Sequence, residues 1–532
     1  MKNSIITFIL FLIFSSNLHA NTFYVATNGL DTSPGTAAQP WKTIQKAANL
    51  LLAGDTVLIK AGTYKERVTV QHSGNSNQYI VFSNYQNEVV TIDGDGLTWG
   101  NWNGLFDVSD QNYIVITGLG IKNSAFGGIW AEKSQHIIIR DNYTYNTKSS
   151  GIGVWDSKFI TVENNEVELA CNDGGQECIT ISNSSNCEIM RNHVHDNGPG
   201  TNGGEGIDVK EGTHDVKVFE NLVHDLNARV GIYADAWDKH TYNIEIYRNK
   251  VHHCTNSGFA IASERGGLIE NVTFSNNISF YNKWDGIELG GWKNGTYAGS
   301  TPVKHIKFIN NTCYKNGAIG NGWGYGIVVD NVDAEDIVIR NNILSGNSAQ
   351  IGLEKIKMGG QVDHNLIYGD NTAQDAVFGS DSILGDPKFL DLIAFNFRLQ
   401  GNSPAIDVGD TLDAPAFDFA NSIRPYGNGI DLGAYEYNST LPAPDAAQPD
   451  PAIKLFPNPF SDELKIFLMG QKPGNYTIQL FTHSGKLVRE IIWSGRKSQA
   501  IIMQRKNLNS GLYILNIQHG DENVFSKKLI IE

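Results

Sequence analysis

The stretches IIIRDNYTY (residues 137–145) and ITVENNEVE (residues 160–168) share one plan. Each has a run of alternating apolar residues, then an asparagine, then a second short alternating run; a third short run beginning with Gly-Ile follows. The same plan recurs around Asn142, Asn165, Asn192, Asn221, Asn249, Asn277, Asn311 and Asn342. Three short strands per repeat of this length are typical of one coil of a right-handed parallel β-helix.

Stacking explains why the chain repeats. No coil can bury its apolar face alone, and coils stacked about 4.8 Å apart complete the hydrogen bonds of every strand. We expect the aligned asparagines to form a ladder whose amides bond from coil to coil. His195, His224 and His252 each lie three residues after a ladder asparagine, so we expect a stacked row rather than metal ligands.

The amino-terminal end predicts export and a cap. Residues 1–20, MKNSIITFILFLIFSSNLHA, contain a lysine, an apolar run and a small residue, Ala20, at the expected cleavage site, as a cleaved signal peptide does. That run is too short for an ordinary transmembrane helix, and no second long apolar run follows. Residues 21–437 would form the β-helix domain, with a helix from Trp41 to Leu52 capping its open end and residues 385–437 closing the other.

The carboxy-terminal end has a different composition. Residues 438–452 are rich in Pro, Ala and Asp and predict a linker, and residues 453–532 alternate like a small antiparallel β-sandwich. The elements LFPNPF (455–460), SGLYIL (510–515) and KKLIIE (527–532) resemble the type A sorting domain of the Bacteroidetes type IX secretion system. The resemblance implies that the secretion machinery is a partner and that the protein is released or held at the cell surface.

Composition narrows the class further. The chain has 56 acidic and 41 basic residues, a net charge of -15, which argues against a nucleic-acid partner. Its five cysteines include no close CxxC pair, which favours buried structural cysteines over zinc or a disulfide framework. We expect an all-β, monomeric, exported protein.

Charged residues are concentrated in consecutive coils, at the third strand of the repeat, which begins with Gly-Ile. In GEGIDVKEG (204–212), alternation puts Ile207 and Val209 in the core and predicts that Asp208 and Lys210 face solvent. The following coils carry GIYADAWDKH, ASERGG and WDGIELGGW. Carboxylates interleaved with aromatic rings are how proteins grip and cut sugars. Expected substrate-binding residues are Trp155, Tyr233, Trp237, Asp238, His240, Arg265, Trp284 and Trp292.

A hydrolytic site is the preferred interpretation. Asp208 to Asp235, and Asp235 to Glu264, are each one coil and two residues apart, which places their Cα atoms roughly 8 Å from each other and suits a glycosidase pair. Asp235 would be the nucleophile or base and Asp208 or Glu264 the acid, with Glu288 as the next candidate. Lys210, beside Asp235, would keep that carboxylate ionised. This interpretation needs no cofactor.

Two alternatives remain open. A lyase would use Glu205, Asp208, Asp235 and Asp238 to hold calcium, Lys210 as the base and Arg265 to bind a uronate. A non-catalytic carbohydrate-binding surface protein is the third possibility. Basic residues among the carboxylates favour an acidic or sulfated polysaccharide in each case.

Two enzyme families share these motifs. The opening segment, residues 23–70, and the coils EGI (205–207), YADAWD (233–238) and DGIELGG (285–291) resemble polysaccharide lyase family nine, whose DDGWD coil binds calcium. Glu288 stands where that family has its base lysine. GIYADAW (231–237) resembles the GIWLDW coil of glycoside hydrolase family 120, with Asp235 at the nucleophile position. That family's acid falls on Ile261, so Glu264 would act from a shifted place.

Overall fold

A computed structural model describes the chain from residue 20 onward. Residues outside the description are 1–19, 174, 200–201, 293–298, 318–323, 354–359, 373–375, 393, 439–452, 457–462, 469–475, 483–485, 494–500, 510, 520–521 and 532. The chain forms two compact units. One comprises residues 1–388 and 399–437, and the other comprises residues 389–398 and 438–532.

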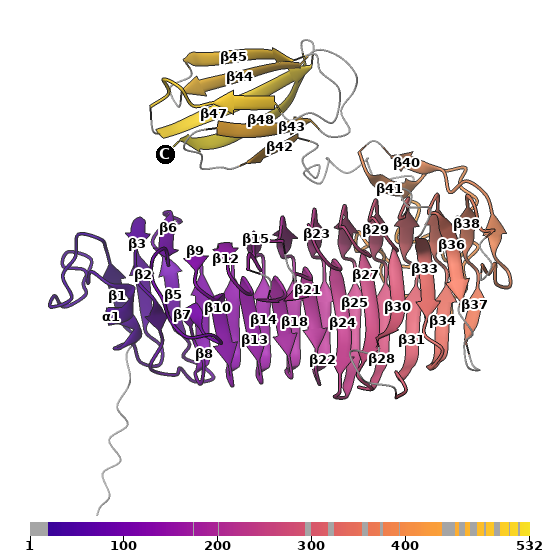
Figure 1. The fold of residues 1–532 in the computed structure, drawn as a ribbon, viewed down its shortest axis with the longest axis horizontal. Coiled ribbons are helices and arrows are strands. Elements are labelled where there is room, and N and C mark those ends of the chain that lie inside the picture. Colours follow the sequence, from indigo (N-terminus) through magenta and orange to yellow (C-terminus); the bar gives the residue numbers. More distant parts are fainter. Residues whose placement is uncertain are drawn as a thin grey trace, which may run out of the picture. The chain divides into compact units, whose positions relative to one another are not determined.

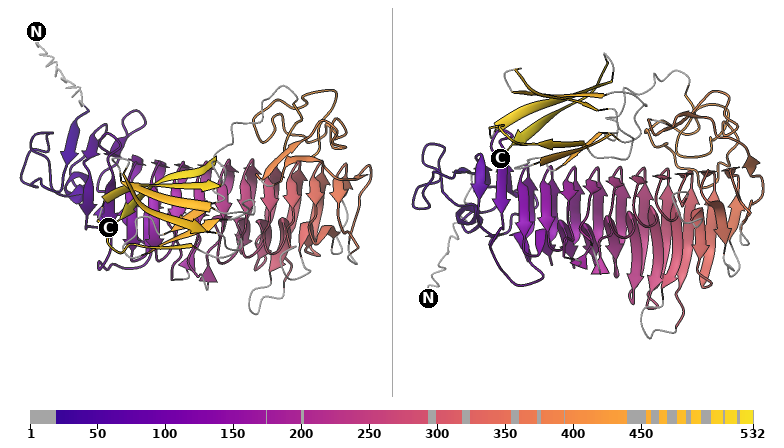
Figure 2. Two further views of the ribbon diagram at one scale, coloured as in Figure 1. Left: turned by 90° about the horizontal axis from the view of Figure 1, so that it is seen from above. Right: turned by 45° about the horizontal axis from the view of Figure 1, so that its top comes forward.

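The first unit is a solenoid of three parallel sheets, which run side by side along the stack (Figures 1 and 2). The A sheet contains β1 (Thr22–Val25), β2 (Thr56–Ile59), β5 (Ile80–Asn84), β8 (Asn112–Thr117), β11 (Gln135–Arg140), β14 (Lys158–Glu163), β18 (Ser185–Met190), β22 (His214–Phe219), β25 (Thr241–Tyr247), β28 (Ile269–Ser275), β31 (Val303–Ile309), β34 (Ala334–Arg340) and β37 (Gln361–Asp363).

The B sheet contains β3 (Gly62–Tyr64), β6 (Val90–Asp93), β9 (Gly120–Ser124), β12 (Tyr143–Thr147), β15 (Glu166–Glu168), β19 (His193–His195), β23 (Leu222–His224), β26 (Lys250–His252), β29 (Ile278–Phe280), β32 (Thr312–Tyr314), β35 (Ile343–Ser345), β38 (Leu366–Tyr368) and β39 (Ile383–Leu384). The C sheet contains β4 (Val68–Thr69), β7 (Gly104–Asp107), β10 (Gly127–Glu132), β13 (Ile152–Trp155), β17 (Ile179–Ser182), β21 (Ile207–Lys210), β24 (Ile232–Trp237), β27 (Phe259–Glu264), β30 (Ile287–Trp292), β33 (Tyr325–Asp330) and β36 (Ala349–Leu353). The pair β16 (Gly175–Gln176) and β20 (Asn202–Gly203) lies outside these sheets. The predicted parallel β-helix is therefore confirmed.

The asparagine ladder stabilises one corner of the coils from Asn142 to Asn365. Asn165 donates from Nδ2 to the Oδ1 of Asn192 at 3.0 Å, and Asn192 does the same to Asn221 at 3.0 Å. The residue before the ladder position has a left-handed backbone, with φ of 53° at Asn164 and 55° at Arg191, which turns the chain from the A sheet into the B sheet. The buried amides satisfy the backbone groups at that turn, so the predicted structural role is confirmed.

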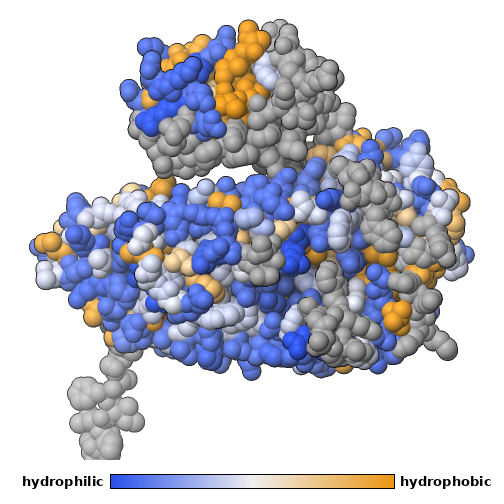
Figure 3. All heavy atoms as spheres, in the orientation of Figure 1, coloured by the Kyte–Doolittle hydropathy of each residue, from blue (hydrophilic) through white to orange (hydrophobic). Residues whose placement is uncertain are grey.

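The stacking of the histidine row is also confirmed. The rings of His195 and His224 stack with centroids 5.3 Å apart, and those of His224 and His252 with centroids 5.0 Å apart. All five cysteines are buried and unbonded, as predicted. Inward residues from the three sheets form one continuous apolar core, whereas the face of the β-helix seen in Figure 3 is largely hydrophilic.

The capping helix is shorter than predicted. Helix α1 spans Ile44–Ala48, not Trp41 to Leu52. The Thr43 side chain accepts a hydrogen bond from the Lys46 N–H and begins the helix, while Asn49 ends it. Leu52 donates its N–H to Asp55 at 2.9 Å and lies in a turn. The apolar spacing continued past the helix because this turn also buries a leucine, Leu51.

The segment of residues 399–437 packs along the coils. Asn310 donates from Nδ2 to the Asp431 carbonyl at 2.9 Å, and Arg424 donates to the Asn276 Oδ1 at 3.0 Å. These contacts involve two different coils, because Asn276 and Asn310 each precede a ladder asparagine. The segment therefore covers a corner of the stack along its length.

The second unit contains antiparallel sheets. Its strands are β42 (Ile453–Phe456), β43 (Glu463–Leu468) and β46 (Ile501–Gln504) in one sheet and β45 (Leu487–Trp493), β44 (Tyr476–Thr482), β47 (Gly511–His519) and β48 (Glu522–Ile531) in another. Strand β40 (Phe389–Asp391) pairs with β41 (Asn396–Leu399). The predicted linker falls on residues that lie, except for Asn438, outside the described part, as does almost all of the predicted signal peptide. Within the described residues, no helix is long and apolar enough to cross a membrane.

Candidate functional site

The C-sheet register places the predicted site residues in rows. One row runs through Asp208, Tyr233, Ala260 and Glu288, which pair in sequence across β21, β24, β27 and β30. In the next row Asp235 pairs with Ala262, and two residues further along Trp237 pairs with Glu264. The predicted offset of one coil and two residues between neighbouring carboxylates is therefore correct.

The prediction that Asp208 and Lys210 face solvent is wrong. Alternation holds, since Ile207 and Val209 lie in the core, but Asp208 is only 2% exposed, Lys210 8% and Asp235 6%. These side chains leave the core outward and then pack against one another and against large neighbours on adjacent coils. The charged row is consequently a buried site, where ionic interactions are much stronger than at a solvated surface.

Lys210 is the buried cation of this site. Its Nζ donates to the Glu177 Oε1 at 2.8 Å and to the Gln176 Oε1 at 3.3 Å, and it lies 5.5 Å from the centre of the Trp155 ring. Burial alone would lower the pKa of Lys210, but Glu177, Asp208 and Asp235 raise it overall. Lys210 is therefore a protonated counter-ion to the acidic residues around it.

Glu177 was missed as a site residue by sequence reasoning. Its side chain is buried just before β17, and its partner Lys210 comes from the next coil. The signal that would have found it is positional: Glu177 is aligned with Glu205, whose carbonyl accepts the Cys178 N–H at 2.8 Å. Burial and the nearby Glu177 raise the pKa of Glu205 to about 7.

Asp208 and Asp235 form the centre of the site. Burial raises the pKa of Asp208, and Asp235 and Glu177 add to the effect. Burial and Glu264 likewise raise the pKa of Asp235, while Lys210 opposes them. Among the described residues, neither Asp208 Oδ1 nor Asp235 Oδ1 has a hydrogen-bond partner, although both atoms are buried. Such acceptors are rare in folded proteins and indicate a place for a ligand.

Two indole N–H groups on the same sheet are also buried without a hydrogen-bond partner among the described residues. Trp130 and Trp155 stack with ring centroids 5.8 Å apart, and the Nε1 atom of each is buried with no partner in the described chain. Trp102, not predicted, contacts the Trp155 ring edge-on at 5.3 Å and is 51% exposed. The C sheet therefore offers donors and acceptors that hydroxyl groups of a sugar chain would satisfy.

Most of the remaining predicted binding residues lie on β24 and in the turns that follow β24 and β27. Tyr233 is buried and donates from Oη to the Glu264 Oε1 at 2.7 Å, so it positions Glu264 rather than presenting an open ring. Arg265 lies 5.2 Å from the centre of the Trp237 ring. Asp238 is exposed in the turn after β24.

His240, also exposed beyond that turn, contacts the Glu270 carboxylate at 3.0 Å through Nε2. Trp284 is 38% exposed before β30. The side chain of Trp292 lies outside the described residues.

A second acidic group includes Glu288 and the unpredicted Asp285. The Ser257 hydroxyl lies 2.8 Å from the Glu288 Oε2 and 3.3 Å from the Asp285 Oδ2. Burial, and then Glu288, raises the pKa of Asp285 to about 7, and burial raises that of Glu288. Glu288 therefore belongs to a group of its own rather than to the Asp208 and Asp235 pair.

The four predicted calcium ligands do not assemble. In the described part of the chain, groups of three or more possible ligand atoms within 4.8 Å of one another include none of Glu205, Asp208, Asp235 or Asp238. Asp238 is exposed, and the Lys210 ammonium lies among the others. The charge of Lys210 already offsets part of the negative charge that a calcium ion would neutralise there.

A groove also lies on the A sheet. It has a volume of about 850 Å³ and is lined by residues such as Phe159, Asn186 and Lys217. None of the predicted site residues lines it. Its charged side chains are exposed, and none of its lining residues is among the described residues with a buried, unsatisfied side-chain atom.

The fold and site define a β-helix protein of the carbohydrate-active type. Residues 23–377 match the family described as "Pel9A-like, right handed beta helix region", and the chain belongs to that family. Residues 454–532 match the "Secretion system C-terminal sorting domain", which indicates secretion or a cell-surface location through the type IX system.

The chain is also similar to curated relatives and to a solved structure with this fold. The uncharacterized protein YwoF of Bacillus subtilis (strain 168) is 28% identical over 446 residues, 72% of this chain and 91% of the relative. Pectate lyase PEL9 of Emericella nidulans is 29% identical over 140 residues, 23% of this chain and 34% of that protein. The structure titled as XylC with xylose aligns with a TM-score of 0.51 and 14% identity, covering 78% of this chain and 98% of that one.

Proposed function

We propose that the protein is an exported glycoside hydrolase that cleaves an acidic or sulfated polysaccharide at the C sheet. The observation that carries the proposal is the pair of buried carboxylates on neighbouring coils, Asp208 and Asp235, each with an oxygen that lacks a partner among the described residues. Two carboxylates in different protonation states are the chemical requirement of this reaction.

The electrostatics assign the roles. Two close buried carboxyl groups cannot both ionise easily, so the pair holds a proton. Lys210 is next to Asp235 in its row, and the acids Asp235 and Glu177 disfavour ionisation of Asp208 more than Lys210 favours it. Asp208 is then the general acid, and Asp235 is the nucleophile or the base that activates water. Glu264 accepts a hydrogen bond from Tyr233 and adds a further carboxylate beside Asp235.

The residues argue against the lyase alternative, which rests on the family match and on the likeness to pectate lyase PEL9. A base must lose its proton near neutral pH, but the surrounding acids raise the pKa of Lys210. The predicted calcium ligands do not meet, and Glu288 occupies the position of the family's base lysine.

Exposed basic side chains suggest the substrate class. Lys239, His240 and Arg265 lie around the turns after β24 and β27, where Arg265 lies against the Trp237 ring. Guanidinium and ammonium groups bind carboxylate and sulfate groups of a polysaccharide, and an indole ring binds the C–H face of a sugar. The substrate would thus extend from Trp155, past the acid pair, to Trp237.

One assay separates the three functions. The purified protein is incubated with a panel of neutral, uronic and sulfated polysaccharides, with and without EDTA, and both reducing ends and absorbance near 235 nm are followed. Reducing ends without new absorbance, unchanged by EDTA, are expected. Absorbance that EDTA abolishes would establish the lyase instead. Retardation in a polysaccharide gel without any product would establish a binding protein.

A further inference from the structure

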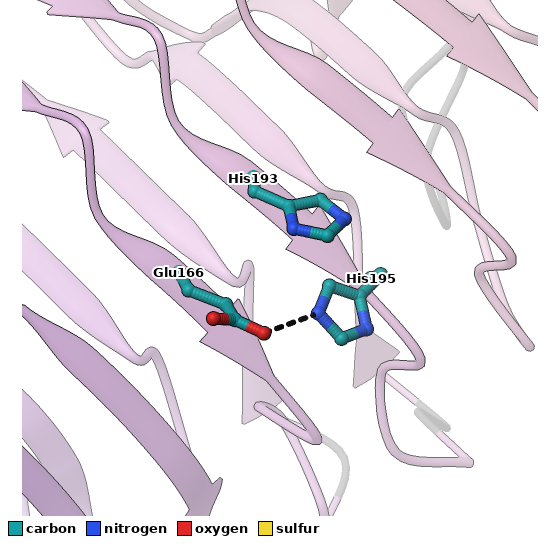
Figure 4. A group of neighbouring side chains, drawn as sticks. All are labelled: Glu166, His193 and His195. Atoms are coloured by element: carbon teal, nitrogen blue, oxygen red, sulfur yellow. Dashed lines mark hydrogen bonds and ion pairs between the residues drawn. The ribbon is translucent and has the colours of Figure 1, made fainter. Parts of the chain in front are cut away.

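We propose that Glu166, His193 and His195 on the B sheet form a binding site for a divalent transition-metal ion, of which zinc is the best fit. One ring nitrogen of each histidine and one Glu166 oxygen lie within 4.8 Å of one another. Figure 4 shows the two rings and the carboxylate turned toward a common point. The three residues come from the adjacent strands β15 and β19 and share no side chain with the acid site of the C sheet.

The neighbouring carboxylates fix the tautomer of His195. Its Nδ1 lies 2.9 Å from the Asp196 Oδ2, an acceptor, so Nδ1 carries the proton in the neutral ring. The lone pair is then on Nε2, which lies 3.3 Å from the Glu166 Oε1. These two atoms are acceptors when the ring is neutral, so either a proton or a metal cation must lie between them, and we infer that a metal ion can take that place. A histidine whose other nitrogen donates to a carboxylate is the usual arrangement of a metal ligand.

A second chain of hydrogen bonds fixes His193. His224 Nδ1 lies 2.6 Å from the Asp225 Oδ2, so His224 donates there and its Nε2 is an acceptor. His224 Nε2 is 2.7 Å from the His193 Nε2, which must therefore carry the proton that is shared. The lone pair of neutral His193 is consequently on Nδ1, the ring nitrogen that Figure 4 shows on the side of Glu166 and His195.

The spacing fits a small tetrahedral ion. Ligand atoms bound at about 2.0–2.1 Å to a tetrahedral centre lie about 3.3 Å apart, which is the separation between His195 Nε2 and Glu166 Oε1. Two imidazoles and one carboxylate favour zinc and its neighbours over calcium, which prefers six to eight oxygens. The Glu166 side chain is 50% exposed, so an ion can enter and water can fill the fourth position.

The other comparable cluster does not offer the same chemistry. Asp363, His364 and Asp410 also lie within 4.8 Å of one another, but Arg340 donates to both oxygens of Asp363, at 2.5 and 2.8 Å. An arginine that already neutralises a carboxylate in this bidentate way removes it as a metal ligand. This cluster serves as an internal control.

Metal titration of tag-free, EDTA-stripped protein tests the proposal. Zinc binding is measured by calorimetry, and Co²⁺ is used as a spectroscopic probe because its visible absorption is intense only in tetrahedral-like sites. One equivalent of zinc is expected, with competition between Zn²⁺ and Co²⁺ and none from Ca²⁺. His193→Gln and Glu166→Gln should each weaken binding at least tenfold.

Matched variants make the outcome decisive. His214→Gln changes a histidine that contacts its neighbour Asp215 at 2.8 Å but stacks on Tyr242 rather than on a second histidine, and it should bind zinc like the unaltered protein. Glu166→Gln alters a half-exposed side chain and should preserve the melting temperature of the metal-free protein. Absence of saturable binding, unchanged affinity in both cluster variants, or loss of binding in His364→Gln would each overturn the proposal. None of these results bears on the hydrolase.

Discussion

The outward faces of the A and C sheets use the same kinds of residues in opposite ways. On the A sheet, Lys217 and Glu245 of neighbouring coils lie 3.9 Å apart, with side chains 47% and 59% exposed. On the C sheet, Lys210 and Glu177 lie 2.8 Å apart, with side chains 10% and 7% exposed. Both pairs join neighbouring coils, and the difference between them is the burial of the C-sheet pair.

Burial changes the free energies involved. Exposed ion pairs contribute about 0–1 kcal/mol because water screens them. The loss of one partner from a buried pair costs about 3–5 kcal/mol because the other charge is left unpaired. Lys217 on the A sheet has Glu245 as its ion-pair partner, whereas the C sheet places several acids around Lys210. A cluster of buried acids is unfavourable for folding, and such clusters are common at functional sites.

The largest contrast is expected in catalysis. Asp235→Asn should lower the turnover of a responsive polysaccharide by roughly 10²–10⁴-fold, since the amide can act neither as nucleophile nor as base. The fold should persist, because the change also removes a like charge from a buried group. Glu245→Gln on the A sheet is the control and should leave turnover unchanged. An Asp235→Asn enzyme with more than half of the original rate would refute the site.

Stability should show the next largest contrast. Lys210→Met should lower the free energy of unfolding by about 3–5 kcal/mol, because Glu177, Asp208 and Asp235 lose their buried cation. Lys217→Met should change it by less than about 1 kcal/mol. Urea titrations of both variants give the comparison. Equal losses would show that the C-sheet face is as solvated as the A-sheet face.

The pH dependence of stability sharpens the comparison further. Burial raises the pKa of Asp285 from its ordinary value of 3.8 to about 7, so the folded state favours the neutral acid. Its contribution is complete below about pH 4, declines as the pH rises, and is absent above about pH 7.

Asp285→Asn should therefore reduce the fall in stability between pH 4.5 and pH 7.5 by as much as about 3 kcal/mol, because about 2.5 pH units of that window lie below the raised pKa, at 1.36 kcal/mol each. Unfolding free energies of the variant and the unaltered protein at both pH values measure the effect. Glu335→Gln, which removes the exposed partner of Lys304 on the A sheet, should leave the pH profile as it is. Identical profiles for Asp285→Asn and the unaltered protein would contradict the burial of this acid.

The smallest effect is expected at the indole donors. Trp155→Phe keeps a ring beneath Lys210 but removes an N–H that has no partner among the described residues. The Michaelis constant should rise about fivefold, which corresponds to one hydrogen bond of about 1 kcal/mol. Phe159→Ala, at an exposed ring in the A-sheet groove, should not alter it. An unchanged Michaelis constant in Trp155→Phe would place the substrate elsewhere.

Much of the site could be predicted from the repeat. The alignment of coils correctly put Asp208 beside Tyr233, and Asp235 one coil and two residues from Glu264. It failed for Glu177, because that residue lies in a turn before its strand, where the alternation rule does not apply. It also failed for the helix, since apolar spacing cannot show that Asn49 ends it and that Leu51 is buried from a turn.

The sequence by itself determined the coil, its register and the in-or-out direction of each strand residue. These follow from local periodicity and from the need of every coil to bury its apolar face against the next. Only the tertiary structure decided which outward charges are buried, because exposure depends on the side chains of neighbouring coils. For the same reason, the Glu166 and His193 side chains face each other only when their two adjacent coils, those of β15 and β19, are stacked.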